Sequence, residues 1–228
     1  MSLTNTSANN LRTKYFEHKP LPKIEIPRKE IDGKRYYVTP NGDAYRSVTT
    51  VLSELSKEGI AKWREKVGHE EANRISSKAS TRGTKLHNMM EDYVGNIEDF
   101  ALNKMPTTTA LFLDLQPIVD LNVQEVYGIE YPLYSDRLKA AGTSDLICLY
   151  NGKPTILDYK TANKAKQEKW INNYFIQSTA YSIMVKERYD IDIEQIVIMI
   201  AVDHDQPQVF VKDPNDFISE TVRIFDTY

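Results

Sequence analysis

The sequence has a single cysteine, no membrane-length apolar run and no glycine-rich phosphate loop. Cys148 alone cannot form an internal disulfide or a cysteine cage for zinc or an iron–sulfur cluster. The longest strictly apolar run, Ile196 to Val202, is far shorter than the ~20 residues that a membrane span needs. Without a Gly-Lys-Ser/Thr phosphate loop we expect no ATPase or helicase activity. No basic region followed by an apolar stretch opens the chain, so we expect no secretory signal and a cytoplasmic protein.

The composition favours one folded domain with an uneven charge distribution. The 228 residues are 41% hydrophobic and 27% charged, which suits one sizeable core and not a disordered chain. The net charge is −3, but residues 57–87 hold eight Lys or Arg against four Glu, whereas residues 186–228 hold ten acids against four bases. This asymmetry predicts a basic surface on an acidic protein, although a solvated helix face explains the charges about equally well.

The N-terminal half has mainly helical patterns. Residues 1–30 are polar or interrupted by proline, and we expect an extended arm there. A single domain then covers residues 31–228. It begins with a hairpin whose tight turn is Asn41-Gly42. Ser47 or Thr49 can cap the helix that follows, with helical patterns over residues 51–55, 59–66, 69–93 and 106–121. Residues 31–122 therefore form the mainly helical part of the domain.

The second half, residues 123–228, alternates strands and helices. Strand patterns cover residues 123–134, 140–150, 154–161, 193–203 and 208–212. A long amphipathic helix is expected from about residue 166 to 188, and a closing helix after Asp213. This order predicts an α/β (α+β) fold with a central mixed β-sheet flanked by helices.

Two carboxylates meet in one predicted hairpin. If Asn151-Gly152 is a two-residue turn, counting back pair by pair places Asp145 opposite Asp158, and Lys160 points to the same face. Two buried carboxylates repel each other, so they need a shared proton, a cation or a metal ion. Hard oxygen donors suit Mg²⁺ or Mn²⁺, and Lys160 could position water or neutralise charge on a phosphate. The ordinary alternative is a structural Asp–Lys pair.

Three short motifs then carry a family resemblance: GTSD (142–145), ILDYKT (156–161) and QSTAY (177–181). Together they resemble the PD-(D/E)XK nuclease superfamily in its RecB-like exonuclease branch, most of all the mitochondrial genome-maintenance exonucleases and their phage relatives. SVTTVL, Trp63-Arg64, RGTKLH and Glu91 extend the resemblance over roughly residues 45–189. It implies a sheet of the restriction-endonuclease-like type and a metal-dependent DNA exonuclease.

The resemblance implies a role for each matched residue. Asp145 and Asp158, with the backbone carbonyl of Tyr159, would bind catalytic Mg²⁺ or Mn²⁺. His87 would be a further metal ligand or a partner of a metal-bound water. Lys160 would orient or activate the attacking water.

Supporting positions also match. Gln177 and Tyr181 fit the QxxxY motif, which supports the catalytic lysine and contacts the DNA backbone in this family. Glu130 matches an acidic position on the preceding strand and is a candidate for catalytic support or a second metal. Ser144 replaces the family's proline. The four cysteines that hold an iron–sulfur cluster in some relatives are absent, so we exclude that cofactor.

Four further residues are candidates for DNA binding. Arg82 and Lys85 are placed for phosphates entering the site, and Trp170 and Tyr174 could stack on bases. The ordinary alternatives are solvated charges for the first pair and core aromatics for the second.

The motif residues have ordinary alternatives too. His87 could pair at the surface with Glu91, one helical turn later. Gln177 and Tyr181 could be buried polar residues without a catalytic role. Glu130 is about equally explained as an uninvolved strand residue.

We therefore expect a Mg²⁺-dependent DNA exonuclease of low sequence specificity that prefers single strands or free ends. Its setting would be recombination, repair or degradation of DNA in a bacterial or phage-infected cell. A recombinase, a single-strand-binding protein or a helicase would be a suitable partner, and no membrane contact is expected. The alternatives are a flap or branch endonuclease with the same site, a DNA-binding module with a decayed site, and a phosphoesterase for another substrate.

Overall fold

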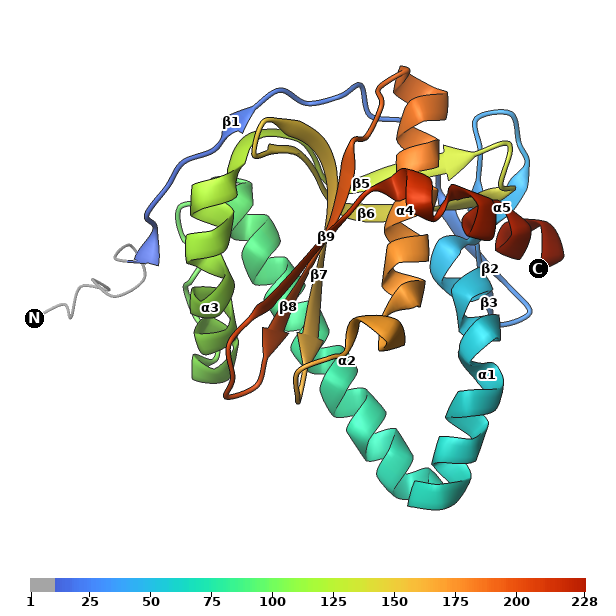
Figure 1. Ribbon diagram of the computed structural model, residues 1–228, viewed down its shortest axis with the longest axis horizontal. Coiled ribbons are helices and arrows are strands. Elements are labelled where there is room, and N and C mark those ends of the chain that lie inside the picture. Colours follow the sequence, from blue (N-terminus) through green and yellow to red (C-terminus); the bar gives the residue numbers. More distant parts are fainter. Residues whose placement is uncertain (1–10) are drawn as a thin grey trace, which may run out of the picture.

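The computed structural model describes residues 11–228, and Figure 1 shows a twisted sheet with helices on both faces. The strands are β1 (Glu17–His18), β2 (Arg28–Ile31), β3 (Lys34–Val38), β4 (Ala44–Ser47), β5 (Val123–Ser135), β6 (Ala140–Tyr150), β7 (Lys153–Ala162), β8 (Gln195–Val202) and β9 (Gln208–Lys212). The helices are α1 (Val48–Val67), α2 (His69–Val94), α3 (Pro106–Asn122), α4 (Asn172–Tyr189) and α5 (Ile218–Thr227), with short turns η2 (Glu168–Trp170) and η3 (Pro214–Asp216).

The sheet is mixed, as predicted. Its order is β2-β3-β4-β6-β7-β8-β9, with β5 along the other edge of β6 and β1 beside β5. The pairs β4–β6 and β7–β8 are parallel, whereas β5–β6 and β6–β7 are antiparallel. Helices α1, α4 and α5 contribute to the core on one face, and α2 and α3 to the core on the other. The predicted class, a central mixed sheet flanked by helices, is confirmed.

The expected arm is extended and packs onto the sheet where it is described. β1 runs parallel to β5, and Phe16 and Ile26 are buried. β2 begins at Arg28, inside the expected arm. The first ten residues lie outside the described part of the chain.

The leading hairpin differs from the prediction at its turns. Val38 pairs with Ala44, so the loop spans residues 39–43, and of Asn41 and Gly42 only Gly42 has a positive φ, 90°. The prediction of a tight Asn41-Gly42 turn is wrong because the strand pairing stops earlier. The two-residue turn is Asp32-Gly33, where φ is 52° and 70°, between β2 and β3.

A long helical hairpin follows β4. Ser47 caps α1 by accepting a 3.0 Å hydrogen bond from the backbone N–H of Thr50. The two helices predicted over residues 51–66 are one continuous helix, because exposed Gly59 lowers helix propensity without breaking the hydrogen-bond ladder. Gly68, with φ of 91°, joins α1 to α2. Figure 1 shows α1 and α2 projecting away from the sheet.

Helix α4 begins six residues later than predicted. The Gln208 side chain binds the backbone N–H of Lys166 at 2.7 Å and its carbonyl at 3.0 Å, using groups that a helix would need. The closing helix is also displaced, because Asp213 caps η3 and α5 starts at Ile218.

Both faces of the central hairpin are buried. Ile147 and Ile156 face the core of α1, α4 and α5, and Leu146 and Leu157 face that of α2 and α3. Across residues 11–228, no helix combines the length and apolarity required to cross a bilayer.

Candidate active site

The central hairpin opens on one side of the sheet. The pairing of β6 with β7 runs from Tyr150–Lys153 to Leu146–Leu157 and then ends, which confirms the predicted register. On the same edge of β6, β4 pairs only with Ala140 and Ala141. The segment Gly142–Asp145 pairs with β5 on one side, and on its other side it faces an opening between β4 and β7, where no strand pairs with it.

Three acidic residues lie side by side across this opening. Ile129 and Tyr131 of β5 pair with Leu146 and Ser144 of β6, so Glu130 faces Asp145. Asp158 follows directly after the last β6–β7 pair, on the other side of Asp145. We call Glu130, Asp145 and Asp158 the carboxylate row. Glu130 has φ of 41°, an unfavourable value for a strand residue, and such strain is concentrated at functional sites.

Asp145 fills the gap between the diverging strands. Its Oδ2 accepts a 2.9 Å hydrogen bond from the backbone N–H of Tyr159 and lies 3.3 Å from His87 Nδ1. One nitrogen of His87 and one carboxylate oxygen each of Glu130 and Asp145 lie within 4.8 Å of one another. The structure thus brings α2, β5 and β6 together at one point. His87 is therefore paired with Asp145 and not, as the alternative from the sequence had it, with Glu91 at the surface.

Asp158 and Lys160 form a second, adjoining group. Asp158 is 3% exposed, makes an ion pair with Lys160, and accepts a 3.0 Å hydrogen bond from Gln177 Nε2 of α4. Lys160 Nζ also lies 5.1 Å from the ring centre of Tyr174, so this aromatic sits beside the candidate catalytic lysine. Gln177 and Lys160 therefore contact the same carboxylate.

Tyr181 is behind the site, inside the core. It is 2% exposed, and a Cβ placed on Gly142 would lie 2.8 Å from its hydroxyl oxygen. The first residue of GTSD is thus a glycine because the Tyr181 side chain occupies the space that a side chain at position 142 would need. In this position Tyr181 supports β6 and presents no surface to DNA.

Burial and mutual repulsion set the protonation of the carboxylate row. Burial, with repulsion from Asp145 and Glu91, raises the pKa of Glu130 to about 7. Burial also raises the pKa of Asp158 to about 6, against the attraction of Lys160. The pKa of Asp145 is lowered, because His87, Lys160 and the Tyr159 N–H outweigh its burial.

Glu130 and Asp145 of the carboxylate row, with His87, fit a divalent cation, whereas Asp158 is paired with Lys160. Two carboxylates and an imidazole nitrogen are within reach of one ion, and oxygen and nitrogen donors of this kind fit a divalent metal cation. Burial and repulsion raise the pKa of Glu130, and a cation bound beside it would stabilise the charged form of this carboxylate. Glu91 lines the same small cavity, and burial raises its pKa. Glu91 lies one helical turn after His87, and this spacing in the sequence indicates that the two side chains lie close together.

The remaining candidates lie around the site. Arg82 binds the Asn163 side chain and lies 3.6 Å from Asp203. Lys85 Nζ lies 2.8 Å from Met105 Sδ at the start of α3. Trp170 is 59% exposed in η2, so it is not a core aromatic.

Comparisons with known proteins give one distant likeness. No protein-family model and no curated protein sequence matches the chain. Among solved structures, the chain is similar to a protein of Eubacterium rectale whose name describes it as a candidate exonuclease. The TM-score is 0.44 at 11% identity, over 65% of this chain and 64% of that one. The chain thus spans less than two thirds of that protein. No family is shown.

Proposed function

We propose that the chain is a metal-dependent nuclease that hydrolyses phosphodiester bonds in DNA, as an exonuclease on single strands or free ends. The observation that carries the proposal is the carboxylate row at the opening of the sheet, with Lys160 beside it and His87 against it. Burying carboxylates and a lysine together destabilises the folded state. Phosphoryl transfer is a reaction that uses both kinds of group, which gives a reason for keeping them.

The carboxylate row and His87 would hold Mg²⁺ or Mn²⁺, together with the Tyr159 carbonyl. The bound ion would polarise the scissile phosphate and lower the pKa of a bound water. Asp158 and Tyr174 hold the Lys160 ammonium group, which would orient the attacking water and counter the charge that develops on the phosphate oxygens. Gln177 positions Asp158 and thereby Lys160.

The helical hairpin supports a nucleic-acid substrate. α1 and α2 carry the eight bases of residues 57–87, and most of their side chains are exposed. Cationic side chains bind phosphates without reading bases, which favours a DNA substrate of any sequence. Arg82 and Lys85 would contact phosphates close to the carboxylate row. A recombinase, single-strand-binding protein or helicase would supply substrates for such an enzyme, in recombination, repair or degradation of DNA in a bacterial or phage-infected cell.

The test is a gel assay with end-labelled single-stranded, double-stranded and circular DNA, with Mg²⁺ and with EDTA. We expect Mg²⁺-dependent loss of linear single strands with circles spared. Cleavage of circles would identify an endonuclease with the same site. Binding without cleavage of any substrate would contradict nuclease activity and favour a DNA-binding module.

Two variants test the assignment of residues. Asp158→Ala and Lys160→Ala should each reduce cleavage by at least about a thousandfold, since each removes a group needed in the transition state. Lys153→Ala, at the exposed far end of the same strand, and Asp192→Ala, on the surface, are matched controls and should cleave normally. Normal cleavage by either active-site variant would contradict the mechanism.

A further inference from the structure

The loop between β7 and α4, residues 163–170, has a composition that the fold does not explain. Lys164, Lys166 and Lys169 are exposed, and none of them has an ion-pair partner within residues 11–228. The only acid of the loop, Glu168, is 2.7 Å from Lys212. The loop ends in Trp170, which is 59% exposed although a tryptophan is costly to leave in water.

This loop is nevertheless held in place by its backbone. The side chain of Gln208 binds both backbone groups of Lys166, and Arg82 binds the side chain of Asn163. These contacts tie the loop to β9 and α2. Within residues 11–228 they leave the three lysines without an acidic partner, and Lys169 Nζ lies 5.8 Å from the ring centre of Trp170. A fixed backbone with free cations is a preorganised surface for anions, because little conformational entropy is lost on binding.

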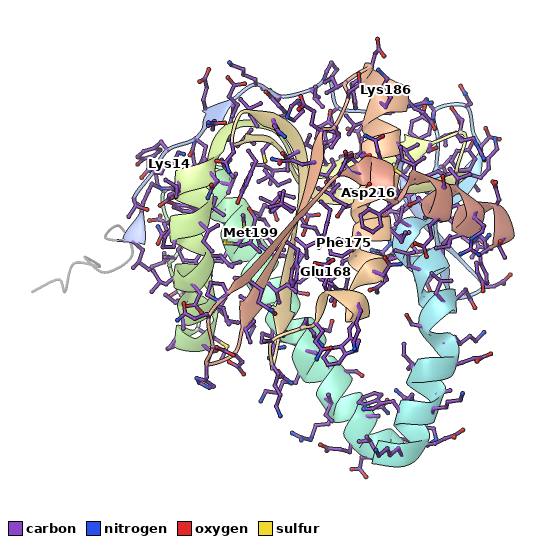
Figure 2. All side chains as sticks on the ribbon, in the orientation of Figure 1. Lys14, Glu168, Phe175, Lys186, Met199 and Asp216 are labelled. Atoms are coloured by element: carbon purple, nitrogen blue, oxygen red, sulfur yellow. The ribbon has the colours of Figure 1, made fainter. Side chains whose placement is uncertain are left out.

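The loop is also continuous with the candidate active site. It starts three residues after Lys160, and it leads into α4, where the ring of Tyr174 lies 5.1 Å from Lys160 Nζ. The Tyr174 N–H binds the carbonyl of buried Ile171 at 2.8 Å, so a single turn separates the exposed indole from Tyr174. Figure 2 labels Glu168 of this loop below Phe175, toward the end of α4 that is nearer the helical hairpin.

We propose that Lys164, Lys166, Lys169 and Trp170 form the surface that selects unpaired nucleotides for the site. The lysines bind successive phosphates, and the Trp170 indole stacks on one base. A base inside a duplex is already stacked on both faces, so only an unpaired strand offers one to Trp170. This inference rests on the proposed nuclease function and adds which surface selects a single strand.

The first test measures binding to a labelled thymidine oligonucleotide by fluorescence anisotropy in EDTA, where no cleavage occurs. Trp170→Ala should weaken binding about five- to a hundredfold, and Trp170→Phe should retain most of it. An oligonucleotide with abasic sites should bind the wild type and Trp170→Ala equally, because no base is left to stack.

The second test separates the lysines from the tryptophan by salt dependence. Each phosphate contact on a single strand contributes about 0.7 to the slope of log K against log salt. The triple variant Lys164→Gln, Lys166→Gln, Lys169→Gln should therefore lose a slope of about 2, whereas Trp170→Ala should keep the wild-type slope. Lys153→Gln is the control for loss of an exposed lysine elsewhere.

The outcomes distinguish this inference from the function on which it rests. If the wild type cleaves no DNA with Mg²⁺, the nuclease proposal is overturned, whatever the binding shows. If the wild type cleaves DNA but Trp170→Ala binds thymidine and abasic strands as the wild type does, the selecting surface alone is overturned. Equal binding of duplex and single strands by the wild type would overturn it as well.

Discussion

Replacing Glu130 by Gln should stabilise the metal-free protein at alkaline pH. Glu130 faces Asp145 across the strand pair, and burial with this repulsion raises its pKa from 4.5 to about 7. The folded state therefore binds the proton more tightly than the unfolded state does. The stability that this proton contributes is present below pH 4.5 and is lost as the pH rises through 7.

The size of the effect follows from that difference. A change of this size in a fully buried group would correspond to about 3 kcal/mol, but Glu130 is partly exposed, which reduces the effect to about 1–2 kcal/mol. For a chain of this length, each kcal/mol shifts Tm by about 2–4 °C. Glu130→Gln should therefore melt about 2–8 °C above the wild type at pH 8 in EDTA, and the difference should shrink toward pH 5.

Thermal unfolding followed by circular dichroism in EDTA, from pH 5 to 8, measures this difference. Glu125→Gln is the matched control on β5, because hydrogen bonds from Lys19 and Tyr127 lower the pKa of Glu125. Its loss should not stabilise the protein at pH 8. With Mg²⁺ the order should change, since the wild type gains from cation binding and Glu130→Gln gains less. A Glu130→Gln variant that melts below the wild type in EDTA at pH 8 would refute the reasoning.

Three further substitutions test separate parts of the site. Gly142→Ala should cost about 1–3 kcal/mol in urea unfolding, because its Cβ would lie 2.8 Å from the Tyr181 hydroxyl and 3.0 Å from the ring. Tyr181→Phe, which removes the nearest atom, should recover part of this loss, and the same loss in both backgrounds would contradict the contact. Mg²⁺ at about 100 times its Kd should stabilise the wild type by about 2.7 kcal/mol, and Asp145→Asn should abolish that gain; an undiminished gain would place the ion elsewhere. Gln177→Leu should lower kcat about 10- to 100-fold with little change in KM, because Asp158 loses its 3.0 Å hydrogen bond; an unchanged kcat in stopped-flow cleavage would rule out this positioning role.

The parts of the site that sequence could predict are those set by local turns. The Asn151-Gly152 turn determines the register of β6 and β7, so the position of Asp158 next to Asp145 follows by counting from the turn. The turn Asp32-Gly33 is equally local but was missed, because every residue of β2 is exposed and gives no alternation.

The parts that sequence could not predict depend on distant pairing. The position of Glu130 beside Asp145 requires the register of β5 against β6, and that register shifts at Val123/Glu125 and again at Val126/Gly128. The pattern of residues in the sequence does not show where such register shifts occur. The partner of Gln177 depends likewise on how α4 is rotated against the sheet, which the core packing sets.

The projecting helical hairpin should unfold locally more often than the rest of the protein. Between Ser53 and Lys85 only Ala72 is buried, so the outer turns of α1 and α2 have almost no packing to hold them. Their helicity depends on backbone propensity, which alone is marginal in water. These turns should unfold and refold many times while the sheet stays intact, so their amides should exchange hydrogen first. A protease specific for basic residues should cut there, at Lys62 or Arg74, and leave the carboxylate row assembled.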